Sequence, residues 1–117
     1  MSIKGKKVLV LGLSKSGIAA ANFANQHGAE VYLSEGKPIT DDKLMQIKDL
    51  KKKGIHTEFS GHSEDFINKA ELAITSPGIP PHSEILQRLK NKHIPIISEL
   101  ELCYRECDIP FIIITGT

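Results

Sequence analysis

Short apolar runs alternate with amphipathic segments along this chain of 117 residues. The apolar runs are too brief for helices and rich in branched side chains, as in parallel strands buried on both faces. The segments between them repeat apolar residues every three or four positions, the spacing of a helix with one buried face. Strands are expected at residues 8–11, 30–34, 72–75 and 94–98, and the alternation of apolar and polar residues at 55–59 suggests a further, short strand. Helices are expected at residues 18–24, 41–53, 63–66, 84–92 and 99–107.

This alternation predicts an α/β fold, a Rossmann-like open parallel sheet of five strands flanked by helices. The length suits one domain, to which we assign residues 1–108. In residues 109–117, Ile109-Pro110 has the character of a linker, and the apolar run 111–114 ends in Thr-Gly-Thr. We interpret this stretch as a linker and the first strand of a second domain that the sequence cuts short.

Composition and charge narrow the classes of function. The net charge of +1 gives no reason to expect a nucleic acid as partner. There is no membrane-length apolar run and no signal-peptide pattern, so we expect a cytoplasmic protein that does not enter a membrane. The two cysteines, Cys103 and Cys107, and the five histidines show no metal-ligand spacing, so no metal site is expected.

The first candidate site follows the strand at 8–11. Gly12 suits a tight turn into a helix, and unpaired N–H groups at a helix N-terminus attract phosphate. The dinucleotide pattern G-x-G-x-x-G is only partly met, because Ser14 replaces the middle glycine and Gly17 arrives one position early. Lys15 adds a positive charge, and Ser16 could cap the helix or donate its hydroxyl to a ligand. The alternative is a plain strand-to-helix turn with a serine cap.

Two further loops follow predicted strands. Glu35 lies about 20 residues after the glycine turn, where dinucleotide folds place an acid on a ribose hydroxyl; the alternative is an ordinary loop carboxylate. Residues 76–81, Ser-Pro-Gly-Ile-Pro-Pro, form a stiff loop at a strand's carboxyl end, where open α/β sheets bind ligands. The alternative there is a loop stiffened only for stability.

Four motifs together resemble the Mur ligases of peptidoglycan synthesis, most closely the members that add D-glutamate. They are G-K-K-V-L-V-L-G-L-S-K-S-G at 5–17, S-P-G-I-P at 76–80, I-S-E-L-E-L at 97–102 and I-I-I-T-G-T at 112–117. The resemblance covers nearly the whole chain.

The resemblance implies an N-terminal domain that holds the uridine diphosphate of UDP-N-acetylmuramoyl-L-alanine rather than NAD. Gly36 stands where the family commonly has threonine, and it offers no side chain. The residues implied are Leu13, Ser14, Lys15, Ser16 and Gly17 at the diphosphate, Glu35, Gly36 and Lys37 at uracil and ribose, and Ser76, Pro77 and Gly78 near the sugar.

The resemblance also implies the reaction of the longer enzyme. Gly116 and Thr117 would begin the ATP loop of a central domain. Such ligases use ATP and Mg²⁺ to form an acyl phosphate on the substrate carboxylate, which the amine of D-glutamate attacks. The catalytic residues would lie in other domains, so we expect this chain alone to be an inactive, monomeric binding module without a cofactor.

Two other interpretations stay open. One is an NAD(H)-binding domain of a dehydrogenase or a nucleotide sensor, which Ser14 disfavours because the pyrophosphate needs close backbone contact there. The other is a structural remnant that binds nothing. Separate titrations with UDP and NADH would distinguish all three.

Overall fold

The computed structural model describes residues 3–106. The predicted linker and strand at 109–117, including Gly116 and Thr117, lie outside these residues. The strands are β1 (Lys7–Leu11), β2 (Glu30–Ser34), β3 (His56–Glu58), β4 (Leu72–Thr75) and β5 (Ile96–Ser98). The helices are α1 (Lys15–Gln26), α2 (Leu44–Lys52), α3 (Glu64–Lys69), α4 (Glu84–Asn91) and α5 (Glu99–Glu106), with a 3₁₀ turn η1 (Asp41–Lys43) before α2.

The five strands form one parallel sheet in the order β3-β2-β1-β4-β5. The chain builds β1, β2 and β3 outward in one direction, then crosses to the other side of β1 to add β4 and β5. The strand order therefore reverses between β1 and β4, and open α/β sheets bind ligands at the carboxyl ends next to such a point. The prediction of a five-stranded Rossmann-like sheet is confirmed.

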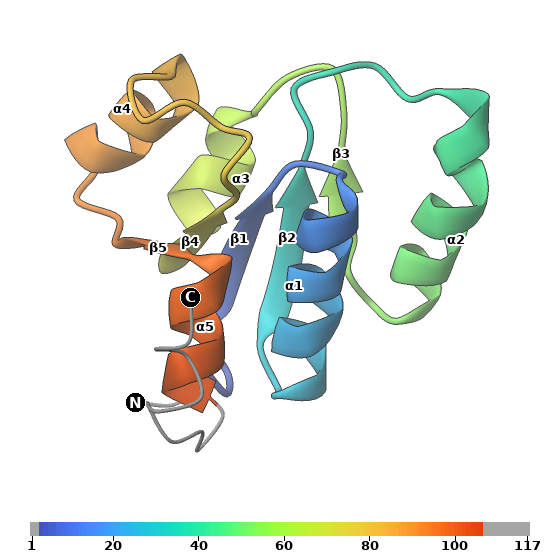
Figure 1. Cartoon of the computed structure of the whole chain (residues 1–117), viewed down its shortest axis with the longest axis horizontal. Helices are drawn as coiled ribbons and strands as arrows, with labels where there is room; N and C mark the ends of the chain where they lie inside the picture. Colours follow the sequence, from blue (N-terminus) through green and yellow to red (C-terminus); the bar gives the residue numbers. More distant parts are fainter. Residues whose placement is uncertain (1–2, 107–117) are drawn as a thin grey trace, which may run out of the picture.

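Alternate residues of β1 enter different cores. Val8 and Val10 pack with apolar residues of α1, α2 and α5, whereas Leu9 and Leu11 pack with those of α3 and α4. The sheet is thus covered on both faces, with three helices on one side and two on the other (Figure 1). Double coverage explains why β1, β2 and β4 are apolar at consecutive positions, whereas the edge strand β3, His-Thr-Glu, is polar. Among residues 3–106, no helix combines the length and apolar character needed to cross a membrane.

The element boundaries differ from those expected. The first helix begins at Lys15, earlier than expected, because Ser14 caps it. The segment 41–53 divides into η1 and α2. The third strand is shorter than 55–59: Ile55 is buried, and its N–H donates to Leu50 O of α2 instead of pairing with β2. The fifth strand begins only at Ile96; Pro95 has no N–H to donate, although its carbonyl accepts a bond from Ala73.

Candidate functional site

A cleft of about 430 Å³ opens at the carboxyl ends of β1, β2 and β4. This is the edge of the sheet at which the strand order reverses. The loop after each of these three strands forms one wall. The cleft is lined by Gly12, Leu13, Ser14, Glu35, Lys37, Pro38, Ile39, Thr40, Lys43, Ser76, Gly78 and Ile79.

The turn between β1 and α1 lines this cleft and leads into the N-terminus of α1. Ser14 is the N-cap of α1, and its Oγ accepts a hydrogen bond from Gly17 N at 3.1 Å. No acceptor among residues 3–106 is bonded to the backbone N–H groups of Ser14, Lys15 or Ser16. Three successive unsatisfied donors at the positive end of a 12-residue helix form a setting for an anion.

Gly17 is required for packing. A Cβ added there would lie 2.2 Å from the carbonyl oxygen of Gly12. Any side chain would therefore push the start of α1 away from the turn. Gly12 itself has a φ of +100°, a conformation that glycine adopts without strain.

Glu35 joins the second wall to the first. Its Oε1 accepts a hydrogen bond from Leu13 N at 2.7 Å, and its Oε2 accepts one from Lys37 N at 3.0 Å. The carboxylate thus fixes the turn after β1 relative to the loop after β2. A carboxylate has about four acceptor positions, so these two bonds leave capacity for a ligand hydroxyl.

The third wall is the loop after β4. It contains a turn in which Ile79 N donates to Ser76 O at 3.1 Å. Ser76, Gly78 and Ile79 line the cleft, whereas the exposed Pro77 does not. The stiff loop predicted at 76–81 therefore contributes to the concave surface.

The structure brings together six of the eleven residues expected at UDP. They are Leu13, Ser14, Glu35, Lys37, Ser76 and Gly78. The other five do not line the cleft: Lys15, Ser16, Gly17, Gly36 and Pro77. Lys15 and Ser16 are exposed on the first turn of α1, so only their backbone N–H groups belong to the anion setting.

Sequence reasoning missed one end of the cleft. Pro38, Ile39, Thr40 and Lys43 form that end, and Ile39 is a large apolar residue left 42% exposed. The apolar pair directly after the Glu35 loop was the available signal. The sequence around Lys43 gave no such signal, because a lysine near a polar helix is typical of a solvent-exposed face.

The charge of the cleft is positive. Lys37 and Lys43 line it, and neither ammonium lies within ion-pair distance of a carboxylate of residues 3–106. Of the described residues that line it, only Glu35 is acidic, and two backbone donors already bond to its carboxylate. The arrangement favours an anionic ligand with a polar, hydroxyl-bearing part.

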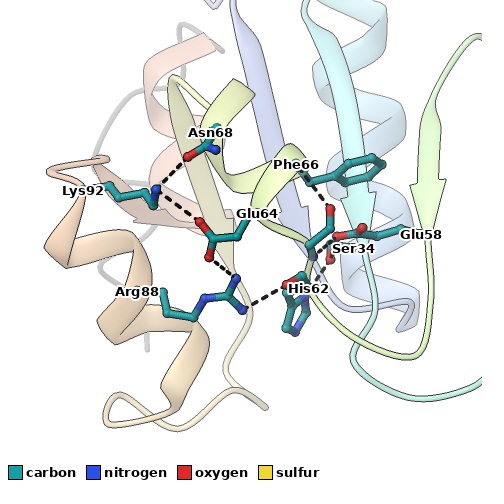
Figure 2. Close-up of polar contacts among 9 residues, drawn as sticks. Ser34, Glu58, His62, Glu64, Phe66, Asn68, Arg88 and Lys92 are labelled. Carbon is teal, nitrogen blue, oxygen red and sulfur yellow. Dashed lines mark hydrogen bonds and ion pairs between the residues drawn. The ribbon is translucent and has the colours of Figure 1, made fainter.

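A polar network lies behind the second wall. Ser34 at the end of β2 is fully buried; its Oγ donates to Glu58 Oε2 at 2.6 Å and lies 2.6 Å from His62 Nδ1 (Figure 2). Burial lowers the pKa of the His62 ring below its usual value, and the Arg88 charge lowers it further, although Glu58 and Glu35 oppose this. No local spacing in the sequence links His62 to Ser34, which lies 28 positions earlier.

The chain is similar to known proteins in sequence and in fold. The sequence model described as Mur ligase MurD-like, N-terminal domain, matches residues 6–98. UDP-N-acetylmuramoylalanine--D-glutamate ligase of Pelodictyon phaeoclathratiforme is 39% identical over 117 residues, all of this chain and 24% of that protein. The protein of the same name from Bacillus cereus is 40% identical over 115 residues, 97% of this chain and 25% of that protein.

Solved structures show the same fold at low identity. A pseudomurein peptide ligase type C from Methanothermus fervidus has a TM-score of 0.73 at 20% identity, over 91% of this chain and 21% of that one. Shikimate dehydrogenase from Aquifex aeolicus has a TM-score of 0.58 at 17% identity, over 94% of this chain and 52% of that one.

The chain thus spans about a quarter of the length of the curated relatives it matches. The matched region contains the whole sheet and all three walls of the cleft. On these grounds the chain belongs to the MurD-like Mur ligase family, and residues 6–98 correspond to the N-terminal domain of that family.

Proposed function

We propose that this chain binds the uridine diphosphate part of UDP-N-acetylmuramoyl-L-alanine. It would do so as the N-terminal domain of an ATP-dependent ligase that adds D-glutamate in peptidoglycan synthesis. The observation that carries the proposal is a row of N–H groups, at Ser14, Lys15 and Ser16, that no described residue satisfies. They lie beside a cleft whose two lysines form no ion pair with the described part of the chain. The names of the relatives supply the substrate and the amino acid.

Each part of the nucleotide has chemistry that suits it in the cleft. The diphosphate would accept hydrogen bonds from the N–H groups at the start of α1, with Lys37 and Lys43 supplying positive charge. The apolar surface of Pro38 and Ile39 suits the face of a nucleobase. Glu35 would take a ribose hydroxyl with its remaining acceptor capacity.

The dehydrogenase-like alternative shares the fold but lacks support from the site. Likeness to shikimate dehydrogenase at 17% identity is a likeness of fold alone. Ser14 places a side chain where a dinucleotide pyrophosphate needs an approach to bare backbone. Membership of the MurD-like family favours the uridine nucleotide.

In this proposal, the ligase reaction is carried out by a longer protein of which this chain is one domain. ATP and Mg²⁺ would activate the substrate carboxylate as an acyl phosphate, and the amine of D-glutamate would attack it. The roles of Gly116 and Thr117 in ATP binding, a cytoplasmic location and a monomeric state remain predictions.

Competitive titration tests the proposal. UDP should bind the chain, and NADH should bind much more weakly. Lys37→Ala and Lys43→Ala should each weaken UDP binding about two- to fivefold, as expected for solvent-screened charges. Lys48→Ala, on the exposed side of α2, is the matched control and should bind as wild type. Equal competition by NADH, or no effect of either cleft lysine, would contradict the proposal.

A further inference from the structure

The nucleotide loop, residues 35–37, rests on the segment from Glu58 to Ser63, which we term the supporting segment. Glu35 N donates to Glu58 O at 3.0 Å, and Gly61 N donates to Glu35 O at 3.3 Å. Ser60 N donates to Lys37 O at 3.0 Å. The position of this wall of the cleft therefore depends on a segment that does not itself line the cleft.

The ring of His62, a residue of the supporting segment, lies between the Ser34 hydroxyl and Gly36 of the nucleotide loop. Ser34 Oγ gives its single proton to Glu58 Oε2, so the ring nitrogen 2.6 Å away, His62 Nδ1, must carry a proton and donate. The opposite edge of the ring faces the nucleotide loop: a Cβ at Gly36 would lie 3.3 Å from His62 Nε2. Glycine at 36 thus leaves the room that the imidazole occupies.

The backbone of His62 is also held in place. Arg88 of α4 donates from Nη1 to His62 O at 2.9 Å, and its Nη2 lies 2.6 Å from Glu64 Oε1 of α3 (Figure 2). Ser63 N donates to Glu58 Oε2 at 2.9 Å. The ring is therefore fixed through its own nitrogen, through its carbonyl and through the next residue.

We infer that His62 is a positioning residue for nucleotide binding. The contact between Gly36 and the His62 ring sets how closely the nucleotide loop approaches the supporting segment. The inference rests on the proposed function, because it assigns the loop to the bound nucleotide. His62 does not line the cleft, so it acts through Gly36 and the backbone bonds of the loop.

The charges around the ring agree with a neutral imidazole in this role. Glu58 of β3 and Glu35 of the nucleotide loop raise the pKa of His62, whereas burial and Arg88 of α4 lower it, and the net direction is downward. A second proton on Nε2 would point toward Gly36, which offers no acceptor side chain.

A double-mutant cycle read out by UDP titration tests the inference. His62→Ala should weaken UDP binding about three- to tenfold, the effect of one supporting hydrogen bond and its packing. Gly36→Ala should also weaken binding, because the new methyl group presses on the ring. In the double variant the Gly36→Ala effect should largely disappear. His62→Asn, whose amide can still donate to Ser34, should recover part of the affinity, and the exposed His93→Asn is the matched control.

Amide exchange in the ligand-free chain separates this inference from the proposed function. The Lys37, Ser60 and Gly61 amides should exchange faster in His62→Ala than in wild type or in His93→Asn. If wild type does not bind UDP, the proposed function fails, and the claim that His62 positions the loop is decided by these exchange rates alone. Unchanged exchange, or additive effects of Gly36→Ala and His62→Ala on UDP affinity, would overturn the inference.

Discussion

The carboxylate of Glu35 accepts a hydrogen bond from the backbone N–H of Leu13 at 2.7 Å, across 22 positions of sequence. This bond joins the turn after β1 to the loop after β2, and a second bond from Lys37 N completes the connection. Glu35, for which we propose a bond to a ribose hydroxyl, therefore holds two walls of the cleft together.

Replacing Glu35 should cost stability as well as affinity. Glu35→Ala removes two charge-assisted hydrogen bonds, so the free energy of unfolding should fall by about 1–2 kcal/mol. Glu35→Gln keeps one acceptor oxygen and should lose less. Urea unfolding followed by circular dichroism measures both, and a Glu35→Ala chain as stable as wild type would show that the bond to Leu13 contributes nothing.

Gly17 and Gly78 should respond differently to the same substitution. Gly17→Ala places a methyl group 2.2 Å from Gly12 O, and overpacking of this kind costs roughly 1–3 kcal/mol. Gly78→Ala meets nothing nearer than 4.0 Å and should change stability by less than about 0.5 kcal/mol. Thermal unfolding of the two variants provides the comparison; equal losses would contradict the close packing of α1 on the turn.

Two serines at helix N-caps form another matched pair. Ser14 Oγ accepts a bond from Gly17 N, so Ser14→Ala should cost about 1 kcal/mol. Ser83 caps α4 without such a bond, and its Oγ is buried with no hydrogen-bond partner among residues 3–106. Ser83→Ala should therefore be neutral within about 0.5 kcal/mol or slightly stabilising. Urea unfolding of both variants checks this, and a larger loss for Ser83→Ala would reverse the argument.

The central strands could be predicted from sequence because both faces of the sheet are covered, which makes β1, β2 and β4 apolar at consecutive positions. The predicted ends of the strands located the loops at the carboxyl edge of the sheet, and the position of these loops predicted where the cleft lies. The directions of individual loop side chains could not be predicted from the strands and helices. Lys15 was expected at the cleft, but it is exposed on the first turn of α1.

Long-range polar contacts were also beyond sequence reasoning. His62 meets Ser34 across 28 positions and Arg88 across 26, and no periodic pattern connects residues that far apart. The role of Glu35 in holding Leu13 was hidden for the same reason. Such contacts depend on how the loops pack, which hydrophobic periodicity does not describe.

Stability should fall in mildly acidic solution because of His62. Burial lowers the pKa of its ring below the usual 6.5, so the unfolded chain takes up the proton more readily than the folded chain. The contribution of the neutral His62 ring to the free energy of unfolding is complete above about pH 6.5, and it is lost as the pH falls through the pKa of His62 in the folded chain. The pKa of Glu64 is lowered mainly by its bond to Arg88, so this residue changes the pH dependence of stability only below its usual pKa of 4.5.

The measurement is urea unfolding at several values between about pH 7.5 and about pH 5.5. Wild type should lose stability across this window, and His62→Asn should lose distinctly less. His93→Asn, a histidine outside the network, should behave as wild type. A wild-type loss that persists unchanged in His62→Asn would assign the pH dependence to another group.

The central claim is that the cleft at the carboxyl ends of β1, β2 and β4 binds a uridine nucleotide. An amide-shift titration of the chain with UDP tests it most directly. The claim predicts the largest shifts at Leu13 to Gly17, at Glu35 to Lys37, and at Gly78. Saturable shifts centred instead on the exposed side of α2, or no shifts at any UDP concentration, would contradict it.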